Sequence, residues 1–209
     1  SSCGNLKKVT LGNGLEIIDQ YTFLDCSKLQ NIVIPDSVYN IQSGVFRDCT
    51  NLVSVHMPSA LTTIGSDAFY GCTALTEIVI PEGVTSIGNS AFYNCKSLSQ
   101  ITFNAVATND FGSNNYVFYN AGANTDGINV VIGNKVTRLP TYLFCSANSN
   151  YSYLPKITSV EFEEGSVCKN IGNSAFYNCT DLTSVIIGNS VTSIGNSAFY
   201  NCTSLTSVI

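Results

Sequence analysis

Nine cysteines are the most reactive groups in this 209-residue sequence, and seven of them share a regular spacing. They recur with a 23-residue period, or resume that spacing after an interruption: Cys3, Cys26, Cys49, Cys72, Cys95, Cys179 and Cys202. In a stack of repeats, equivalent side chains lie parallel about 4.8 Å apart, whereas a disulfide needs Cβ atoms converging to about 3.8 Å. We therefore expect small buried thiols along this series. Cys145 and Cys168 lie outside the series, and the sequence leaves their pairing open.

One histidine and one acidic cluster are the other candidates for chemistry. His56 falls at an outward position of a predicted strand, without the orienting partner that a catalytic base needs. Glu161, Glu163 and Glu164 suggest a cation site, but calcium needs about six to eight oxygen ligands from a loop that this sequence lacks. No cysteine pair has the close spacing of zinc ligands. We therefore expect solvated side chains, no catalytic residue, no metal, no cofactor and no enzyme activity.

The composition argues against two classes of partner. The chain has 14 acidic and 9 basic residues, a net charge of −5, and only 11% of its residues are charged. Nucleic-acid binding depends on clustered basic residues, and no basic run exceeds Lys7-Lys8. No apolar run approaches the roughly 18 residues of a membrane span. We expect neither nucleic-acid binding nor membrane insertion. The N-terminus has no signal peptide, although a leader could precede Ser1.

The elements that position these residues come from one repeated phrase. Residues 171–186 read IGNSAFYNCTDLTSVI and residues 194–209 read IGNSAFYNCTSLTSVI, at the same offset as the regularly spaced cysteines. The same phrase opens at Ile87, and looser copies begin at Ile64 and Ile41. A fixed period of this size predicts stacked units in which each repeat contacts only its neighbours.

Each repeat is expected to contain a short strand, a corner and a single helical turn. The pattern L-x-x-I-x-I followed by proline, as in residues 29–35, indicates a strand with one face inward. A second extended stretch turns the corner. Asn89-Ser90-Ala91-Phe92, after a glycine, is typical of a capped helical turn on the opposite side. The nine predicted strands are Lys8–Leu11, Asn31–Ile34, Ser54–Met57, Glu77–Ile80, Gln100–Phe103, Asn129–Ile132, Ser159–Phe162, Ser184–Ile187 and Ser207–Ile209.

The spacing also divides the chain. We predict a single solenoid over residues 1–209, with regular repeats at 3–103 and 171–209 and irregular, loop-bearing repeats at 104–170. The inserted residues fall in Ala105–Asp126 and Cys145–Pro155. Because both ends stop inside a repeat without a polar cap, we expect a fragment of a longer chain, or self-association through the open strand at the C-terminus.

The 23-residue period and its strand pattern resemble the leucine-rich repeat class. The fuller phrase VTSIGNSAFYNCTSLTSVIIGNS resembles the BspA-like, Treponema pallidum-type leucine-rich repeat family of bacterial surface proteins. Cysteine precedes the leucine by three residues, which differs from ordinary leucine-rich repeats. The resemblance implies a right-handed α/β solenoid, a secreted or cell-surface location in a host-associated bacterium, and an interaction role such as adhesion. It implies no catalytic residue, because the motif contains only packing positions.

Two surfaces are candidate binding sites. The first is the outward face of the strands, a ribbon of β-branched side chains that fits either partner binding or simple strand propensity. Its positions are Thr10, Val33, His56, Val79, Thr102, Val131, Glu161 and Ile186. The second is the pair of inserted loops, whose aromatic side chains fit either a ligand or a cap on their own repeat. These are Phe111, Tyr116, Tyr151 and Tyr153.

Three functions remain open from the sequence. The first is a non-enzymatic, adhesin-like module that presents the sheet face and loops to a host or extracellular-matrix protein. The second is a carbohydrate-binding module that uses the loop aromatics on a glycan. The third is an architectural spacer for another domain.

Overall fold

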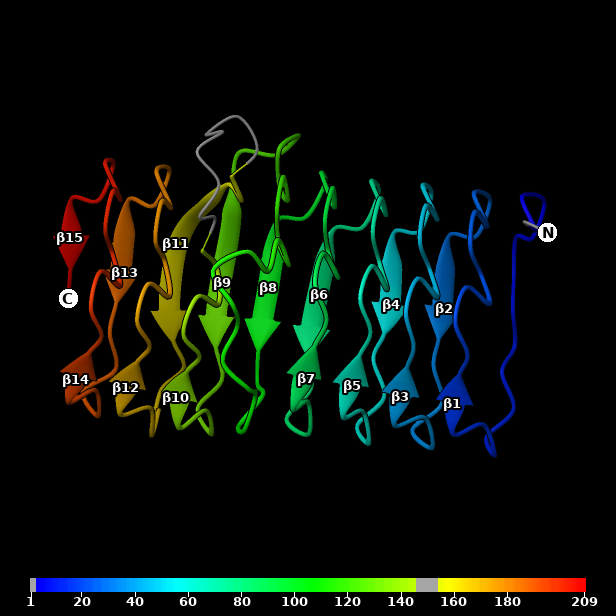
Figure 1. Cartoon of the computed structure of the whole chain (residues 1–209), viewed down its shortest axis with the longest axis horizontal. Helices are drawn as coiled ribbons and strands as arrows, with labels where there is room; N and C mark the ends of the chain where they lie inside the picture. Colours follow the sequence, from blue (N-terminus) through cyan, green and yellow to red (C-terminus); the bar gives the residue numbers. More distant parts are fainter. Residues whose placement is uncertain (1–2, 146–153) are drawn as a thin grey trace.

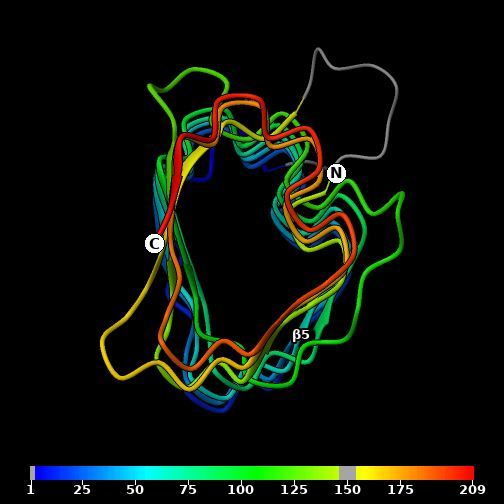
Figure 2. The ribbon, with the colours of Figure 1, turned by 90° about the vertical axis from the view of Figure 1, so that its left-hand side faces the viewer.

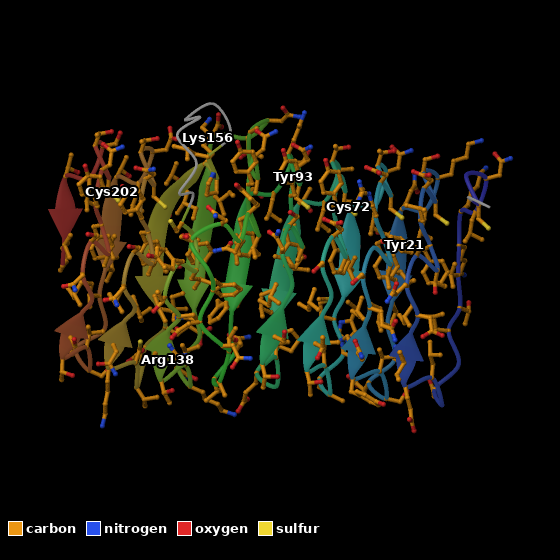
Figure 3. All side chains as sticks on the ribbon, viewed as in Figure 1. Tyr21, Cys72, Tyr93, Arg138, Lys156 and Cys202 are labelled. Atoms are coloured by element: carbon orange, nitrogen blue, oxygen red, sulfur yellow. The ribbon has the colours of Figure 1, made fainter. Side chains whose placement is uncertain are left out.

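The computed structural model describes residues 3–145 and 154–209, which form a stack of turns along one long axis (Figure 1). The two ends of the chain lie at opposite ends of the stack. Viewed along that axis, successive turns superpose into one closed outline (Figure 2). Buried apolar side chains form its core, and side chains are distributed along the whole stack (Figure 3). This arrangement is the repeat solenoid that the 23-residue period predicts.

Two series of parallel strands run along the stack. The main series is formed by β2 (Asn31–Val33), β4 (Ser54–His56), β6 (Glu77–Ile80), β8 (Gln100–Phe103), β9 (Ile128–Ile132), β11 (Ile157–Phe162), β13 (Ser184–Ile186) and β15 (Ser207–Val208). The corner series is formed by β1 (Ile17–Ile18), β3 (Asn40–Ile41), β5 (Thr63–Ile64), β7 (Ser86–Ile87), β10 (Arg138–Leu139), β12 (Asn170–Ile171) and β14 (Ser193–Ile194). Equivalent residues of successive repeats pair directly, for example Ile78 with Ile101.

Eight of the nine strands predicted for the main series are present in the described residues, to within two residues at either end. The prediction at Lys8–Leu11 is wrong, because this segment lies beside β2 without pairing with it. The main series is also not one continuous sheet. Six strands of the main series form one sheet: β6, β8, β9, β11, β13 and β15. The other two, β2 and β4, pair only with each other. Strand pairing therefore stops on both sides of the β2–β4 pair.

The expected helical turns are replaced by tight turns, and the described residues contain no helix. Ser90 and Asn94 have left-handed φ angles of 57° and 59°. In this turn, the N–H groups of Ser90 and Phe92 donate to carbonyls of the next repeat, at 3.0 and 2.8 Å. A helix would instead direct every N–H along its own axis. Hydrogen bonding between repeats therefore overrides the local helical signal.

The core is a set of columns that run along the stack, and one of them is formed by phenylalanine rings. Eight rings stack with neighbouring centroids 5.2–5.5 Å apart: Phe23, Phe46, Phe69, Phe92, Phe118, Phe144, Phe176 and Phe199. Beside them, the thiols of Cys49 and Cys72 donate to phenylalanine carbonyls at 3.1 Å. Most cysteines are buried and all nine are free thiols, although Cys3 is exposed. The expected buried thiols are therefore confirmed except at the two ends of the series, where Cys3 is exposed and Cys202 is only partly buried.

Close approach of neighbouring turns explains the glycine in the repeat. A Cβ atom at Gly88 would lie 2.3 Å from the backbone nitrogen of Ser66 in the preceding turn. No side chain fits at that separation. The glycine is therefore required by packing between repeats, and its φ angle is not left-handed.

Candidate interaction surface

The outward face of the main strands brings the predicted sheet-face residues into two groups. Val33 lies directly opposite His56 on the β2–β4 pair, and both side chains are exposed. Val79 lies opposite Thr102 on β6 and β8, and this row continues across β9 to Glu161 on β11. The break between β4 and β6 separates the two groups. The register of the predicted column is confirmed within each group, but the column is not continuous.

This face carries three well-exposed apolar side chains. Val33 is 68% exposed, Val79 is 45% exposed and Ile186 is 50% exposed. A second row, beside the first, is polar and mostly uncharged. In it the hydroxyl of Ser54 donates to the Asn31 side chain and the hydroxyl of Ser159 donates to the Asn129 side chain, both at 2.7 Å. The face thus combines β-branched contact area with side chains that can form hydrogen bonds.

The loop residues lie elsewhere. The N–H of Phe111 donates to the carbonyl of Thr141 at 3.1 Å, and its ring packs against the core. Asp110 accepts a hydrogen bond from Arg138 of β10, which lowers the pKa of Asp110. These contacts hold the loop in line with the corner series of strands. There it occupies the place of a strand between β7 and β10. The structure therefore does not bring Phe111 together with the sheet-face residues.

The other predicted loop aromatics divide between the described and undescribed parts. Tyr116 is half-buried, and its ring meets that of Tyr119 edge to face at 5.5 Å. It is therefore part of the turn layer. Tyr151 and Tyr153 lie outside the described residues. Of the described pair, Phe111 contacts the core and residue Thr141, whereas Tyr116 contacts Tyr119 of its own turn.

A tyrosine ladder on the turns is a surface feature that sequence reasoning missed. Tyr70, Tyr93 and Tyr119 stack with centroids 4.8 and 5.0 Å apart, and the guanidinium of Arg47 lies 4.4 Å from the ring of Tyr70. A second pair, Tyr177 and Tyr200, stacks at 4.8 Å. The signal was present in the sequence, because tyrosine follows phenylalanine in these repeats. Tyr70 and Tyr93 are partly exposed, whereas Tyr119 is buried.

Electrostatics give no sign of a reactive centre in the described residues. Burial raises the pKa of the Cys49 thiol to about 12 and that of the Cys145 thiol to about 12. Such thiols are poor nucleophiles because the thiolate is the reactive form. Within residues 3–145 and 154–209, no group of three His, Cys, Asp or Glu side chains could hold a metal ion. The same residues include no helix long and apolar enough to cross a bilayer.

Comparison with known proteins places this geometry in context. A family model described as a BspA type leucine-rich repeat region matches six copies over residues 1–124 and 146–209. The crystal structure of a T. pallidum leucine-rich repeat protein is similar at 28% identity and a TM-score of 0.59, covering 84% of this chain and 78% of that one. The pneumococcal vaccine antigen PcpA shares the fold at 16% identity and a TM-score of 0.53, covering 88% of this chain and 40% of that one.

A further similar structure is a leucine-rich repeat protein from Bacteroides ovatus, at 26% identity and a TM-score of 0.40. The alignment covers 93% of this chain but 58% of the Bacteroides protein. A search of curated proteins found no match to the sequence.

Proposed function

Since the chain belongs to the BspA-type leucine-rich repeat family, we propose that it is a non-enzymatic, secreted or cell-surface module that binds a host or extracellular-matrix protein through its sheet face. The observation that supports this proposal is the exposed β-branched row on the main strands. Large apolar side chains on a surface are informative when they are contiguous, because contiguous patches mark interaction sites. Here Val79, Thr102 and Val131 are direct neighbours in register on β6, β8 and β9, with Val79 exposed and the other two partly exposed.

The shape of the surface supports a protein as the partner. Repeat arrays offer extended faces on which many small contacts add up, and this face runs the length of the six-stranded sheet. Apolar side chains would supply the buried centre of an interface, and the parallel polar row would supply hydrogen bonds at its margin. Glu161 and His56 are the ionisable groups of the predicted column and would contribute selectivity more than affinity.

Binding to immobilised extracellular-matrix proteins tests the proposal. The double variant Val79→Asp/Ile186→Asp places charge on the apolar row, and we expect it to weaken binding at least about tenfold. The control is Thr85→Asp, an exposed position beside the corner strand β7 that should leave binding unchanged. Undiminished binding by the double variant would remove the sheet face from the site. Absence of binding by the unmodified chain to every matrix protein would remove the proposed function.

A spacer role is the second candidate, and the continuous phenylalanine column favours it. Eight neighbouring rings in one column, with direct strand pairing within each sheet, would resist bending, as a stalk requires. A spacer has no need of a particular surface, so substitutions on the sheet face should be neutral in every assay. Specific loss of binding on Val79→Asp/Ile186→Asp would therefore contradict the spacer role.

A further inference from the structure

A groove of about 490 Å³ lies between β2 and residues 7–11, the first segment on the main-strand side. Figure 1 shows this segment as the dark blue trace running beside β2. The walls combine apolar side chains from both segments: Val9, Leu11, Ile32, Val33 and Pro35. The volume is within the range of about 300–1,000 Å³ that is typical of ligand sites.

The edge of β2 that faces the groove has unpaired backbone groups. On its other side, β2 bonds to β4: the Gln30 carbonyl accepts from Val53 at 2.8 Å, and the Ile34 N–H donates to the His56 carbonyl at 3.2 Å. In a parallel strand, alternate residues direct both N–H and C=O to opposite sides. Asn31 and Val33 therefore direct theirs toward the groove.

No partner occupies those groups. Among the described residues, no backbone hydrogen bond joins Asn31 or Val33 to residues 7–11, and β2 pairs only with β4. Two N–H donors and two carbonyl acceptors thus form an open strand edge above an apolar floor. An edge of this kind accepts an additional strand from another chain.

The charge around the groove is positive, in a chain whose net charge is −5. Lys7 and Lys8 line it, are exposed, and have no carboxylate within ion-pair distance in the described part of the chain. The remaining polar lining is uncharged: Thr10, Asn13, Gln30 and Asn31. This end of the sheet face therefore complements a negatively charged partner.

We propose that this groove binds an extended acidic segment of a protein partner, which adds as a strand to the free edge of β2. The inference rests on the proposed function, because it assigns a peptide-binding site to one end of the sheet face. Backbone hydrogen bonds to Asn31 and Val33 hold the strand. Alternate β-branched side chains of the strand contact the apolar walls, and its carboxylates lie near Lys7 and Lys8.

The probe is a fluorescent peptide, acetyl-Glu-Val-Thr-Val-Glu-amide, whose binding to the full 209-residue chain is followed by anisotropy. We expect saturable binding that weakens as salt screens the lysines. The lysine peptide, acetyl-Lys-Val-Thr-Val-Lys-amide, should bind at least about tenfold more weakly. The double variant Lys7→Glu/Lys8→Glu should weaken binding of the acidic peptide about tenfold. Lys169→Glu, a charge reversal at an exposed lysine far along the chain, should change it less than about twofold.

Backbone recognition is tested on both partners. Two acidic peptides, N-methylated on alternate amides, differ only in which edge of the strand is blocked, so one should lose binding and the other should keep it. Val33→Pro removes one of the free donors and should weaken binding about tenfold, whereas Val33→Thr keeps that donor and should not. Circular dichroism shows whether Val33→Pro remains folded. If it does not, the methylated peptides decide.

Several outcomes would overturn the proposal. Equal binding of both methylated peptides, or no effect of Lys7→Glu/Lys8→Glu, would show that the edge of β2 is not used. Sedimentation that reveals dimers broken by the same lysine variant would identify a second copy as the occupant instead. If a matrix protein binds but the acidic peptide does not compete, the groove is refuted and the proposed function stands. If the peptide binds and no matrix protein does, the groove stands and the proposed function is refuted.

Discussion

Removal of one ring from the middle of the phenylalanine column should destabilise the protein more than removal of a ring at its end. Phe92 has no exposed surface and stacks on Phe69 at 5.3 Å and on Phe118 at 5.2 Å. Phe199 is half-buried and stacks only on Phe176 among the described residues, at 5.4 Å. The two side chains are identical, so the comparison measures the effect of the neighbouring turns and of the burial that they provide.

The expected magnitude follows from burial. A phenylalanine buries about 150–250 Å², and truncating one to alanine in a core costs about 3–5 kcal/mol. Aromatic pairs add about 0.5–1.5 kcal/mol each beyond their area. With two stacked neighbours, Phe92→Ala should cost about 5 kcal/mol. With one neighbour and partial exposure, Phe199→Ala should cost about 2 kcal/mol.

Urea unfolding followed by circular dichroism measures both losses on the 209-residue chain. In a linear array, loss of a central contact also uncouples the repeats on either side. Phe92→Ala should therefore broaden the transition, with a smaller dependence on denaturant, as well as shift it. Phe199→Ala should shift the midpoint slightly and keep the slope. Equal losses for the two variants would refute the view that each turn is stabilised mainly by its neighbours.

Three further outcomes are expected. Gly88→Ala should lower stability by about 1–3 kcal/mol because of the backbone contact at 2.3 Å, whereas Gly112→Ala, which meets nothing within 4 Å, should be neutral in the same urea assay. In the native chain at pH 8, a thiol reagent should label exposed Cys3 rapidly and buried Cys49 only on unfolding; rapid labelling of Cys49 would contradict the packed thiol column. Stability should also fall as pH rises above about 9. Burial raises the folded-state pKa of Cys49 to about 12. The stability that the protonated Cys49 thiol contributes is therefore complete below the unfolded-state pKa, and it is lost as pH rises toward 12. The urea midpoint at pH 7 and pH 10.5 measures this, and an equal alkaline loss in Cys49→Ala would exclude that thiol as a source.

The regular parts of the fold were predictable because the repeat period and the alternation of apolar side chains indicate the same strands and the same core. Residues 77–80 and 100–103 have apolar side chains at alternate positions, and both segments form strands with those boundaries. The column through Phe69 and Phe92 likewise follows from the constant interval between repeats. The same column continues through Phe144, which no fixed interval identifies. Inserted residues are accommodated outside the core, so the column stays intact although its spacing in sequence changes.

The errors came from interactions between repeats that a single repeat does not reveal. Asn89-Ser90-Ala91-Phe92 has the composition of a capped helical turn, but its N–H groups are needed by the neighbouring turn. Lys8–Leu11 has the alternation of a strand, but a groove separates it from β2, and the two segments do not pair. For the candidate site, the register of the sheet face was predictable from alternation. The corner position of Phe111 was not, because it depends on contacts with residues 138–141 that are distant in sequence.

Direct pairing of like with like has a consequence for the length of the molecule. Across β13 and β15, Ser184 faces Ser207 and Val185 faces Val208. Excision of residues 182–204 would join Asp181 to Leu205 and would present each remaining turn with the same neighbouring side chains as before. The length of the stack can therefore change by one whole turn at a time. Unequal recombination between the near-identical copies would lengthen or shorten the protein without any change in its interior.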